Sequence, residues 1–117
     1  MLRVSLFVAA IVAVVGVVAG PSLAARSHST GTAVTVTATE FKFKLSKTSV
    51  KAGSVTFTVK NAGHVGHDFK IGGKKTPLIG PGKTAKLTVS LKKGKQAYSC
   101  TVPGHAAAGM KGSLAVK

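Results

Sequence analysis

Apolar and polar residues alternate with a period of two along most of the chain from residue 32 onward. Seven runs show this alternation, and their inward-facing members are Val34 and Val36; Phe41, Phe43 and Leu45; Val55, Phe57 and Val59; His67, Phe69 and Ile71; Leu87, Val89 and Leu91; Tyr98 and Cys100; and Leu114 and Val116. A period of two is typical of half-buried strands, whereas an amphipathic helix needs a period near 3.6. The pattern therefore predicts an all-β chain with no helix after residue 32.

Turn-forming residues separate these runs. Gly, Pro, Asn and Lys gather at residues 51–53, 61–63, 72–73, 80–82 and 93–94. Six to eight short strands at this spacing favour a Greek-key antiparallel β-sandwich or barrel. We expect one domain over residues 32–117, and we expect its longest connection, residues 72–83, to cross between sheets.

The N-terminal segment has a different pattern. Arg3 precedes an apolar run over residues 4–19, and small residues follow at 22–24, as in a signal peptide with its cleavage site. We predict a signal peptide over residues 1–24 and a flexible lead-in over residues 25–31. The apolar run is short for a membrane span, so cleavage is favoured over retention as an anchor. The chain is thus expected to be exported to a periplasm, the cell surface or the medium.

The charge of the chain is strongly positive. It has 17 Lys and Arg against 2 Asp and Glu, a net charge of +15 with neutral histidines. Lysines occupy the outward positions of most runs: Lys42, Lys44, Lys60, Lys70, Lys86 and Lys92. Such a surface keeps a protein soluble and protects sheet edges, and it also attracts acidic redox proteins or anionic membranes. Beyond the leader the only arginine is Arg26 and no compact basic-aromatic motif occurs, so nucleic acid is not an expected partner.

The single cysteine carries the most chemical information. An exported chain with one cysteine cannot form an internal disulfide, so Cys100 pairs between chains, stays free or binds a ligand. His105 and Met110 follow it closely, and alternation places His67 on an inward face of another strand. A thiolate, two imidazoles and a weak axial thioether suit copper and form the site that exchanges one electron. We therefore predict His67, Cys100, His105 and Met110 as ligands of one copper ion.

Three alternatives to this copper site are considered. His64 is a competing imidazole three residues before His67, but we expect it to be an exposed loop residue. Zinc accepts thiolate and imidazole ligands but seldom a thioether. An incidental buried cysteine beside unrelated surface residues is the remaining alternative. The thiolate also needs hydrogen-bond donors, for which the amides near Ala62 or His105 are candidates.

The ligand segments resemble those of a known family. Residues 100–112, Cys-Thr-Val-Pro-Gly-His-Ala-Ala-Ala-Gly-Met-Lys-Gly, are similar to the copper loop of bacterial cupredoxins, the plastocyanin- and pseudoazurin-like blue copper proteins. Residues 61–69 and 81–84 are similar to the first-ligand segment and a later turn of that family. The resemblance covers about residues 33–117 and implies a cupredoxin fold, the same four ligands and a prokaryotic exported protein. Four residues separate Cys100 from His105, where plastocyanin has two.

The histidine count limits the possible functions. After His67 and His105 only His28 and His64 remain, too few for a second catalytic copper, and one cysteine cannot form a thiolate-bridged binuclear site. We expect a monomeric one-electron carrier cycling between Cu(II) and Cu(I), with no small-molecule substrate and no enzyme activity. The alternative is a copper storage or delivery protein. The small residues 106–109 should leave His105 accessible to a partner through an apolar patch.

Overall fold

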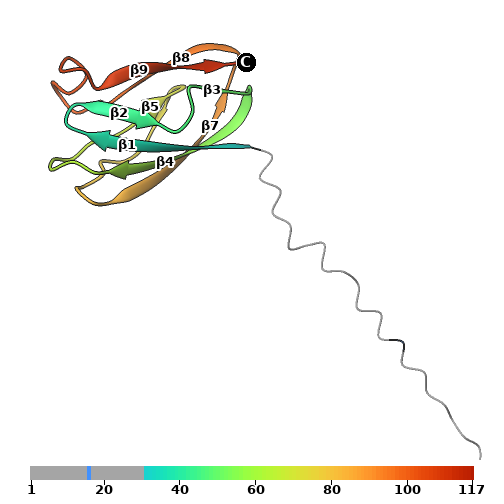
Figure 1. Cartoon of the computed structure of the whole chain (residues 1–117), viewed down its shortest axis with the longest axis horizontal. Helices are drawn as coiled ribbons and strands as arrows, with labels where there is room; N and C mark the ends of the chain where they lie inside the picture. Colours follow the sequence, from blue (N-terminus) through green and yellow to red (C-terminus); the bar gives the residue numbers. More distant parts are fainter. Residues whose placement is uncertain (1–15, 17–30) are drawn as a thin grey trace, which may run out of the picture.

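Two β-sheets pack face to face in the computed structural model, which describes residue 16 and residues 31–117 (Figure 1). The strands are β1 (Thr32–Thr39), β2 (Lys42–Leu45), β3 (Ser49–Val50), β4 (Gly53–Asn61), β5 (Lys70–Ile71), β6 (Lys74–Lys75), β7 (Thr84–Leu91), β8 (Gly94–Ser99) and β9 (Lys111–Val116). One sheet has the order β2-β1-β4-β7 and the other β3-β9-β8-β5-β6. The predicted leader, apart from residue 16, and the lead-in up to residue 30 lie outside the described residues.

The expected all-β sandwich is confirmed, with one correction to strand direction. Strands β1 and β4 run parallel, from Thr32 opposite Val55 to Ala38 opposite Asn61, and β3 is parallel to β9. The antiparallel arrangement predicted from the sequence is wrong for these two pairs. Alternation shows which face of a strand is buried but not its direction. Here β2 and β3 return the chain to its starting end before β4 begins.

The core lies between the sheets and follows the predicted alternation. Its buried members are Val34, Val36, Val50, Val55, Phe57, Val59, Phe69, Ile71, Ile79, Val89, Leu91, Leu114 and Val116. The rings of Phe57 and Phe69 meet with centroids 5.1 Å apart. Burying one such side chain contributes roughly 1.5–3 kcal/mol relative to leaving it exposed.

In two of the predicted runs, the observed strand is shorter than the alternation predicts. Phe41 lies in the turn before β2 rather than in the strand, and its side chain is 41% exposed. The run from His67 to Ile71 is strand only at its end, because His67 makes a single bridge to Ile79. Asp68, expected to point outward, is buried together with its neighbours. Outside a continuous strand, the period of two no longer dictates which side chains are buried.

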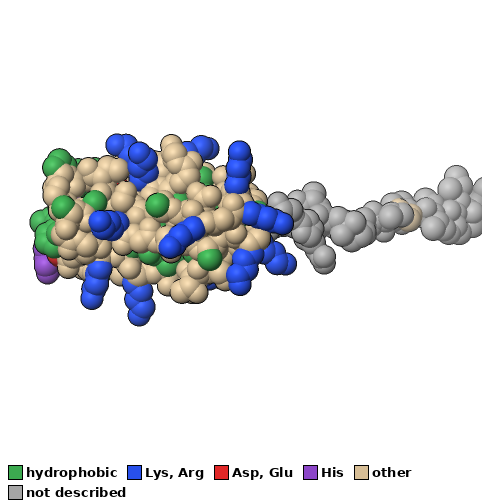
Figure 2. All heavy atoms as spheres, turned by 90° about the horizontal axis from the view of Figure 1, so that it is seen from above, with side chains coloured by type: hydrophobic (Ala, Val, Ile, Leu, Met, Phe, Trp, Pro, Cys, Tyr) green, Lys and Arg blue, Asp and Glu red, His purple; other side chains and the backbone are tan. Residues whose placement is uncertain are grey.

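The connection over residues 72–83 crosses between the sheets, as predicted. It contains β6 in the five-stranded sheet and leads to β7 in the four-stranded sheet. Among the described residues, no helix is long and apolar enough to cross a membrane. Figure 2 shows the lysines spread over the body of the sandwich, while hydrophobic side chains and a histidine occupy its left end in that view. Every lysine of residues 31–117 is exposed.

Candidate metal centre

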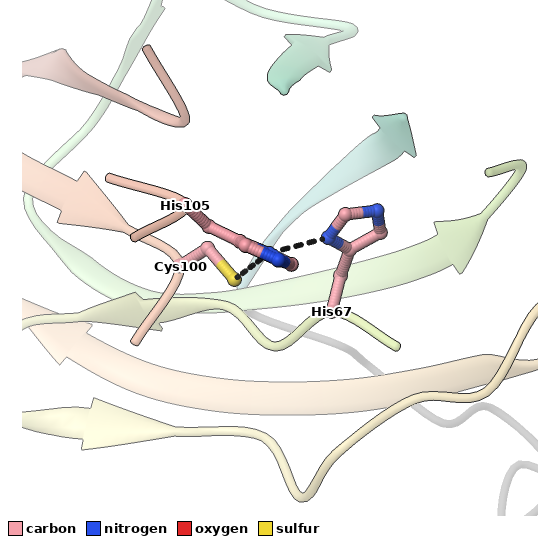
Figure 3. A group of neighbouring side chains, drawn as sticks. All are labelled: His67, Cys100 and His105. Atoms are coloured by element: carbon pink, nitrogen blue, oxygen red, sulfur yellow. Dashed lines mark hydrogen bonds between the residues drawn. The ribbon is translucent and has the colours of Figure 1, made fainter. Parts of the chain in front are cut away.

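Three of the predicted ligands meet at one end of the sandwich (Figure 3). The donor atoms of His67, Cys100 and His105 all lie within 4.8 Å of one another. The two Nδ1 atoms are 3.2 Å apart, and Cys100 Sγ is 3.6 Å from His105 Nδ1. His67 and Cys100 are buried, whereas His105 is partly exposed. The group therefore has two enclosed donors and one that reaches the surface.

Backbone hydrogen bonds fix the loop that carries Cys100 and His105. The Cys100 amide donates to the Met110 carbonyl at 3.0 Å, which closes the loop at its base. The His105 carbonyl accepts from the Met110 amide at 3.1 Å, and the His105 amide donates to Val102 at 3.1 Å. His105 is thus held from both sides of the loop, although no regular strand contains it.

Met110, the fourth predicted ligand, belongs to a small buried cluster beside Cys100. It is fully buried and packs with Cys100 and Ala38, with Phe43 and Val102 at the margin of the group. Burial beside the cysteine is consistent with a thioether as the fourth ligand. The structure therefore brings all four predicted residues to one end of the fold.

His64, the competing imidazole, lies elsewhere. Its side chain is exposed, and it is not part of the donor cluster formed by His67, Cys100 and His105. His28 lies outside the described residues. The geometry thus favours His67 over His64, as the alternation predicted.

The sulfur of Cys100 receives a hydrogen bond from an amide that we had not expected. The donor is the Asp68 amide, 3.5 Å from Sγ. The two predicted donors are engaged elsewhere, because the Ala62 amide donates to Ala38 and the His105 amide to Val102. Burial raises the pKa of the Cys100 thiol, and the hydrogen bond from Asp68 opposes this in part. Without a metal, Cys100 is therefore a protonated thiol at neutral pH.

Asp68 also connects the two ligand segments. Its Oδ1 accepts a hydrogen bond of 2.6 Å from the Thr101 amide, and its Oδ2 accepts one from the Thr101 hydroxyl. Residues directly after His67 and Cys100 are thereby linked. Period-two alternation concealed this role, although the acid stands next to a predicted ligand in a chain with only two acidic residues.

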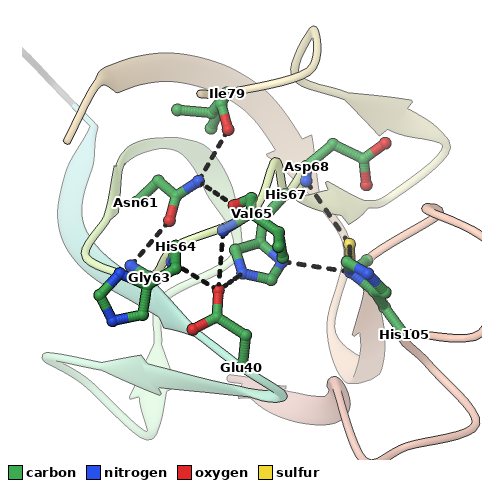
Figure 4. Close-up of polar contacts among 10 residues, drawn as sticks. Glu40, Asn61, Gly63, His64, Val65, His67, Asp68, Ile79 and His105 are labelled. Atoms are coloured by element: carbon green, nitrogen blue, oxygen red, sulfur yellow. Dashed lines mark hydrogen bonds and ion pairs between the residues drawn. The ribbon is translucent and has the colours of Figure 1, made fainter. Parts of the chain in front are cut away.

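The other acidic residue, Glu40, lies against the opposite side of His67 (Figure 4). Its Oε1 accepts hydrogen bonds from the amides of His64 at 2.7 Å and Val65 at 3.1 Å, and lies 3.0 Å from His67 Nε2. These contacts, the His64 amide foremost, lower the pKa of Glu40 to about 2. Nothing in the local sequence around Glu40 indicated this contact.

The side chain of Asn61 also stabilises the loop that carries His67. Its buried side chain donates to the carbonyls of Val65 at 2.7 Å and Ile79 at 2.8 Å, and it accepts from the Gly63 amide at 2.8 Å. An amide that satisfies several backbone groups in a buried position rigidifies the segment around it. The His67 loop is therefore fixed on both of its sides.

The donor set fits a copper ion. One thiol sulfur, two imidazole nitrogens and a buried thioether are the ligands of trigonal copper sites with a weak axial sulfur. Among the described residues, no carboxylate oxygen belongs to the donor cluster of His67, Cys100 and His105. This disfavours magnesium and calcium, because both cations prefer oxygen ligands. The bound ion would be held by His67, Cys100 and His105, and the thioether of Met110 would be a fourth donor.

A family model for the cupredoxin-like domain matches residues 7–116. The chain belongs to the cupredoxin family. This confirms the resemblance inferred from residues 61–69, 81–84 and 100–112. No curated protein is similar enough in sequence to be matched with this cupredoxin.

Solved structures show the same fold. Auracyanin A of Chloroflexus aurantiacus, described as a "blue" copper protein, is 24% identical with a TM-score of 0.62, over 74% of this chain and 99% of its own. A dithionite-reduced auracyanin of Roseiflexus castenholzii is 22% identical with a TM-score of 0.58, over 76% and 98%. Rusticyanin of Thiobacillus ferrooxidans is 24% identical with a TM-score of 0.63, over 74% and 77%. The cupredoxin described here thus spans most of each of these chains.

Proposed function

We propose that this cupredoxin holds one type 1 copper ion and carries single electrons between redox partners. The observation that carries the proposal is that the Cys100 sulfur and one ring nitrogen from each of His67 and His105 lie within 4.8 Å of one another. When bound, the copper ion supplies a one-electron couple. The protein supplies a binding geometry that changes little between the two oxidation states, because hydrogen bonds fix the segments on which the ligands lie.

The burial of the ligands supports electron exchange with a partner through His105. His67 and Cys100 are enclosed, and His105 alone of the three reaches solvent. The ring of Phe41 packs against His105 at a centroid distance of 5.0 Å. The large exposed hydrophobic side chains of the described residues are Phe41, Val65 and Leu78, and Val65 and Leu78 lie in or beside the His67 loop. A partner would approach His105 through this apolar end.

We propose that the partner surface is negatively charged, either an acidic redox protein or an anionic membrane surface. The described lysines are all exposed, and the one ion pair among residues 31–117 joins Glu40 to His67, so no lysine there is neutralised by a carboxylate. Unpaired positive charge accelerates encounter with a negatively charged protein. Export, monomeric state and the absence of enzyme activity remain predictions from the sequence.

The decisive experiment is to load the purified protein with Cu(II) and to record its visible spectrum and reduction potential. An intense thiolate-to-copper band that disappears in Cys100→Ser and His67→Ala but persists in His64→Ala is the expected result. A colourless complex that readily gives up its copper to a chelator would contradict the carrier and favour the storage or delivery alternative. Loss of the band in His64→Ala alone would overturn the ligand assignment.

A further inference from the structure

The carboxylate of Glu40 touches the ring nitrogen of His67 that faces away from the donor cluster. His67 Nδ1 lies 3.2 Å from His105 Nδ1 inside the cluster, while His67 Nε2 lies 3.0 Å from Glu40 Oε1. We propose that Glu40 is a positioning residue that selects the metal-binding tautomer of His67 and lowers the reduction potential of the bound ion. The second half of this proposal rests on the proposed function.

The tautomer follows from hydrogen-bond chemistry. A neutral imidazole carries one N–H, and its other nitrogen is the acceptor that can bind a metal. An ionised carboxylate can only accept, so the short contact with Glu40 requires the hydrogen to lie on Nε2 of His67. The lone pair of Nδ1 is then directed at the donor cluster before any metal arrives.

The position of Glu40 is itself fixed by the loop that it contacts. The same Oε1 accepts the amide hydrogens of His64 and Val65, so one oxygen gathers three donors from a stretch of four residues. Hydrogen bonds to an ionised acceptor are roughly twice as strong as neutral ones. Glu40 therefore clamps the His67 loop to the turn between β1 and β2.

Gly63 supplies an independent sign that the loop is shaped around this carboxylate. A Cβ atom built on Gly63 would overlap the carboxylate atoms of Glu40. The turn that begins at Asn61 thus approaches the Glu40 carboxylate so closely that residue 63 has no space for a side chain, and glycine fits there. A side chain at residue 63 would push the carboxylate away from His67.

The effect on the metal follows from charge. A carboxylate that accepts the outer N–H of a ligating histidine fixes the ring and raises the basicity of the ligand. A more basic ligand and a nearby negative charge stabilise the ion of higher charge. Glu40 should therefore favour Cu(II) over Cu(I).

Two substitutions of Glu40 test the proposal. Glu40→Gln keeps an acceptor oxygen and the shape but removes the charge, and Glu40→Ala removes both. We expect the reduced-to-oxidised ratio at a fixed external potential to rise about tenfold in each variant, which corresponds to about 59 mV for one electron. Lys42→Gln, which changes one exposed charge two residues away, is the matched control and should leave the ratio within about twofold, because exposed charges are screened.

A second readout does not depend on copper. Nitrogen-15 spectra of the imidazole of His67 in the metal-free protein report which ring nitrogen carries hydrogen. The parent protein and Lys42→Gln should show the Nε2–H form, and Glu40→Ala and Gly63→Ala should show a mixture. If Glu40→Ala does not fold, Gly63→Ala carries the tautomer test and Glu40→Gln carries the potential test.

The outcomes separate the two proposals. An unchanged tautomer in Gly63→Ala and in Glu40→Ala where it folds, or an unchanged potential in Glu40→Gln, overturns the role of Glu40. A protein that binds no copper but shows the expected change of tautomer overturns the proposed function while the positioning role stands.

Discussion

The Thr101 amide donates a hydrogen bond of 2.6 Å to Asp68 Oδ1, and this contact joins the residues that follow two different ligands. Asp68 comes directly after His67, and Thr101 directly after Cys100. The Asp68 amide in turn donates to the sulfur of Cys100. Asp68, a single buried residue, thus links the two ligand segments and also supplies a hydrogen bond to the sulfur of Cys100.

Removing this carboxylate should loosen both segments. Asp68→Ala leaves the Thr101 amide and hydroxyl without their acceptor, and we expect the free energy of unfolding to fall by about 1–3 kcal/mol. Thr101→Val removes the hydroxyl contact alone and should cost less. Urea denaturation of the metal-free proteins measures both values. Equal stability of Asp68→Ala and the parent protein would show that the contact contributes nothing.

The sulfur of Met110 should change the reduction potential of the bound copper but should not be required for copper binding. Met110→Leu preserves an apolar side chain of similar volume in the buried cluster with Cys100 and Ala38 but removes the sulfur. The copper complex should retain its thiolate band, because the other three ligands remain, and its potential should change. Spectra and potentiometry of the two proteins test this. An unchanged potential would show that the Met110 sulfur does not act on the ion.

Metal binding should release a proton from Cys100. Since burial raises the pKa of this thiol, the Cys100 thiol of the metal-free protein is protonated at neutral pH, and the metal must displace that proton. The affinity for Co²⁺ should therefore rise about tenfold from pH 7 to pH 8. Calorimetry in buffers of different ionisation enthalpy measures the proton count. Cys100→Ser should lose the pH dependence, and a parent protein with no proton release would contradict the raised pKa.

A contact between β8 and β9 should contribute to the stability of the whole sandwich. Tyr98 lies opposite Gly112, and a Cβ atom on Gly112 would overlap the phenol ring. Gly112→Ala should displace Tyr98 from its contacts with Phe43 and Phe69 and cost about 1–3 kcal/mol. Ser113→Ala, on an exposed neighbour, should change stability by less than about 0.5 kcal/mol. Thermal unfolding compares the two, and equal melting temperatures would contradict the overlap.

The sequence was sufficient to predict the sandwich and the ligand cluster. A lone cysteine restricted the donor set, and alternation distinguished His67 from His64 because it placed one imidazole inward and left the other in a turn. These features depend on local periodicity and on residue chemistry. Both can be inferred without knowledge of the chain path.

The supporting residues were not predictable in the same way. Glu40 reaches His67 across 27 positions of sequence, and Asp68 reaches Thr101 across 33. Such contacts depend on how loops from different strands meet, which periodicity does not encode. The parallel pairing of β1 with β4 was missed for the same reason, because it depends on the route of the intervening chain.

The direction of β1 has a practical consequence for electrochemistry. The strand starts at Thr32, where the N-terminal chain joins the sandwich, and ends at Thr39, one residue before Glu40 at the metal centre (Figure 1). A protein attached to an electrode at Thr32 would hold the centre about 25 Å from the attachment point, given about 3.3 Å per strand residue. Direct electron exchange with that electrode would be slow, while His105 would remain free for a soluble mediator.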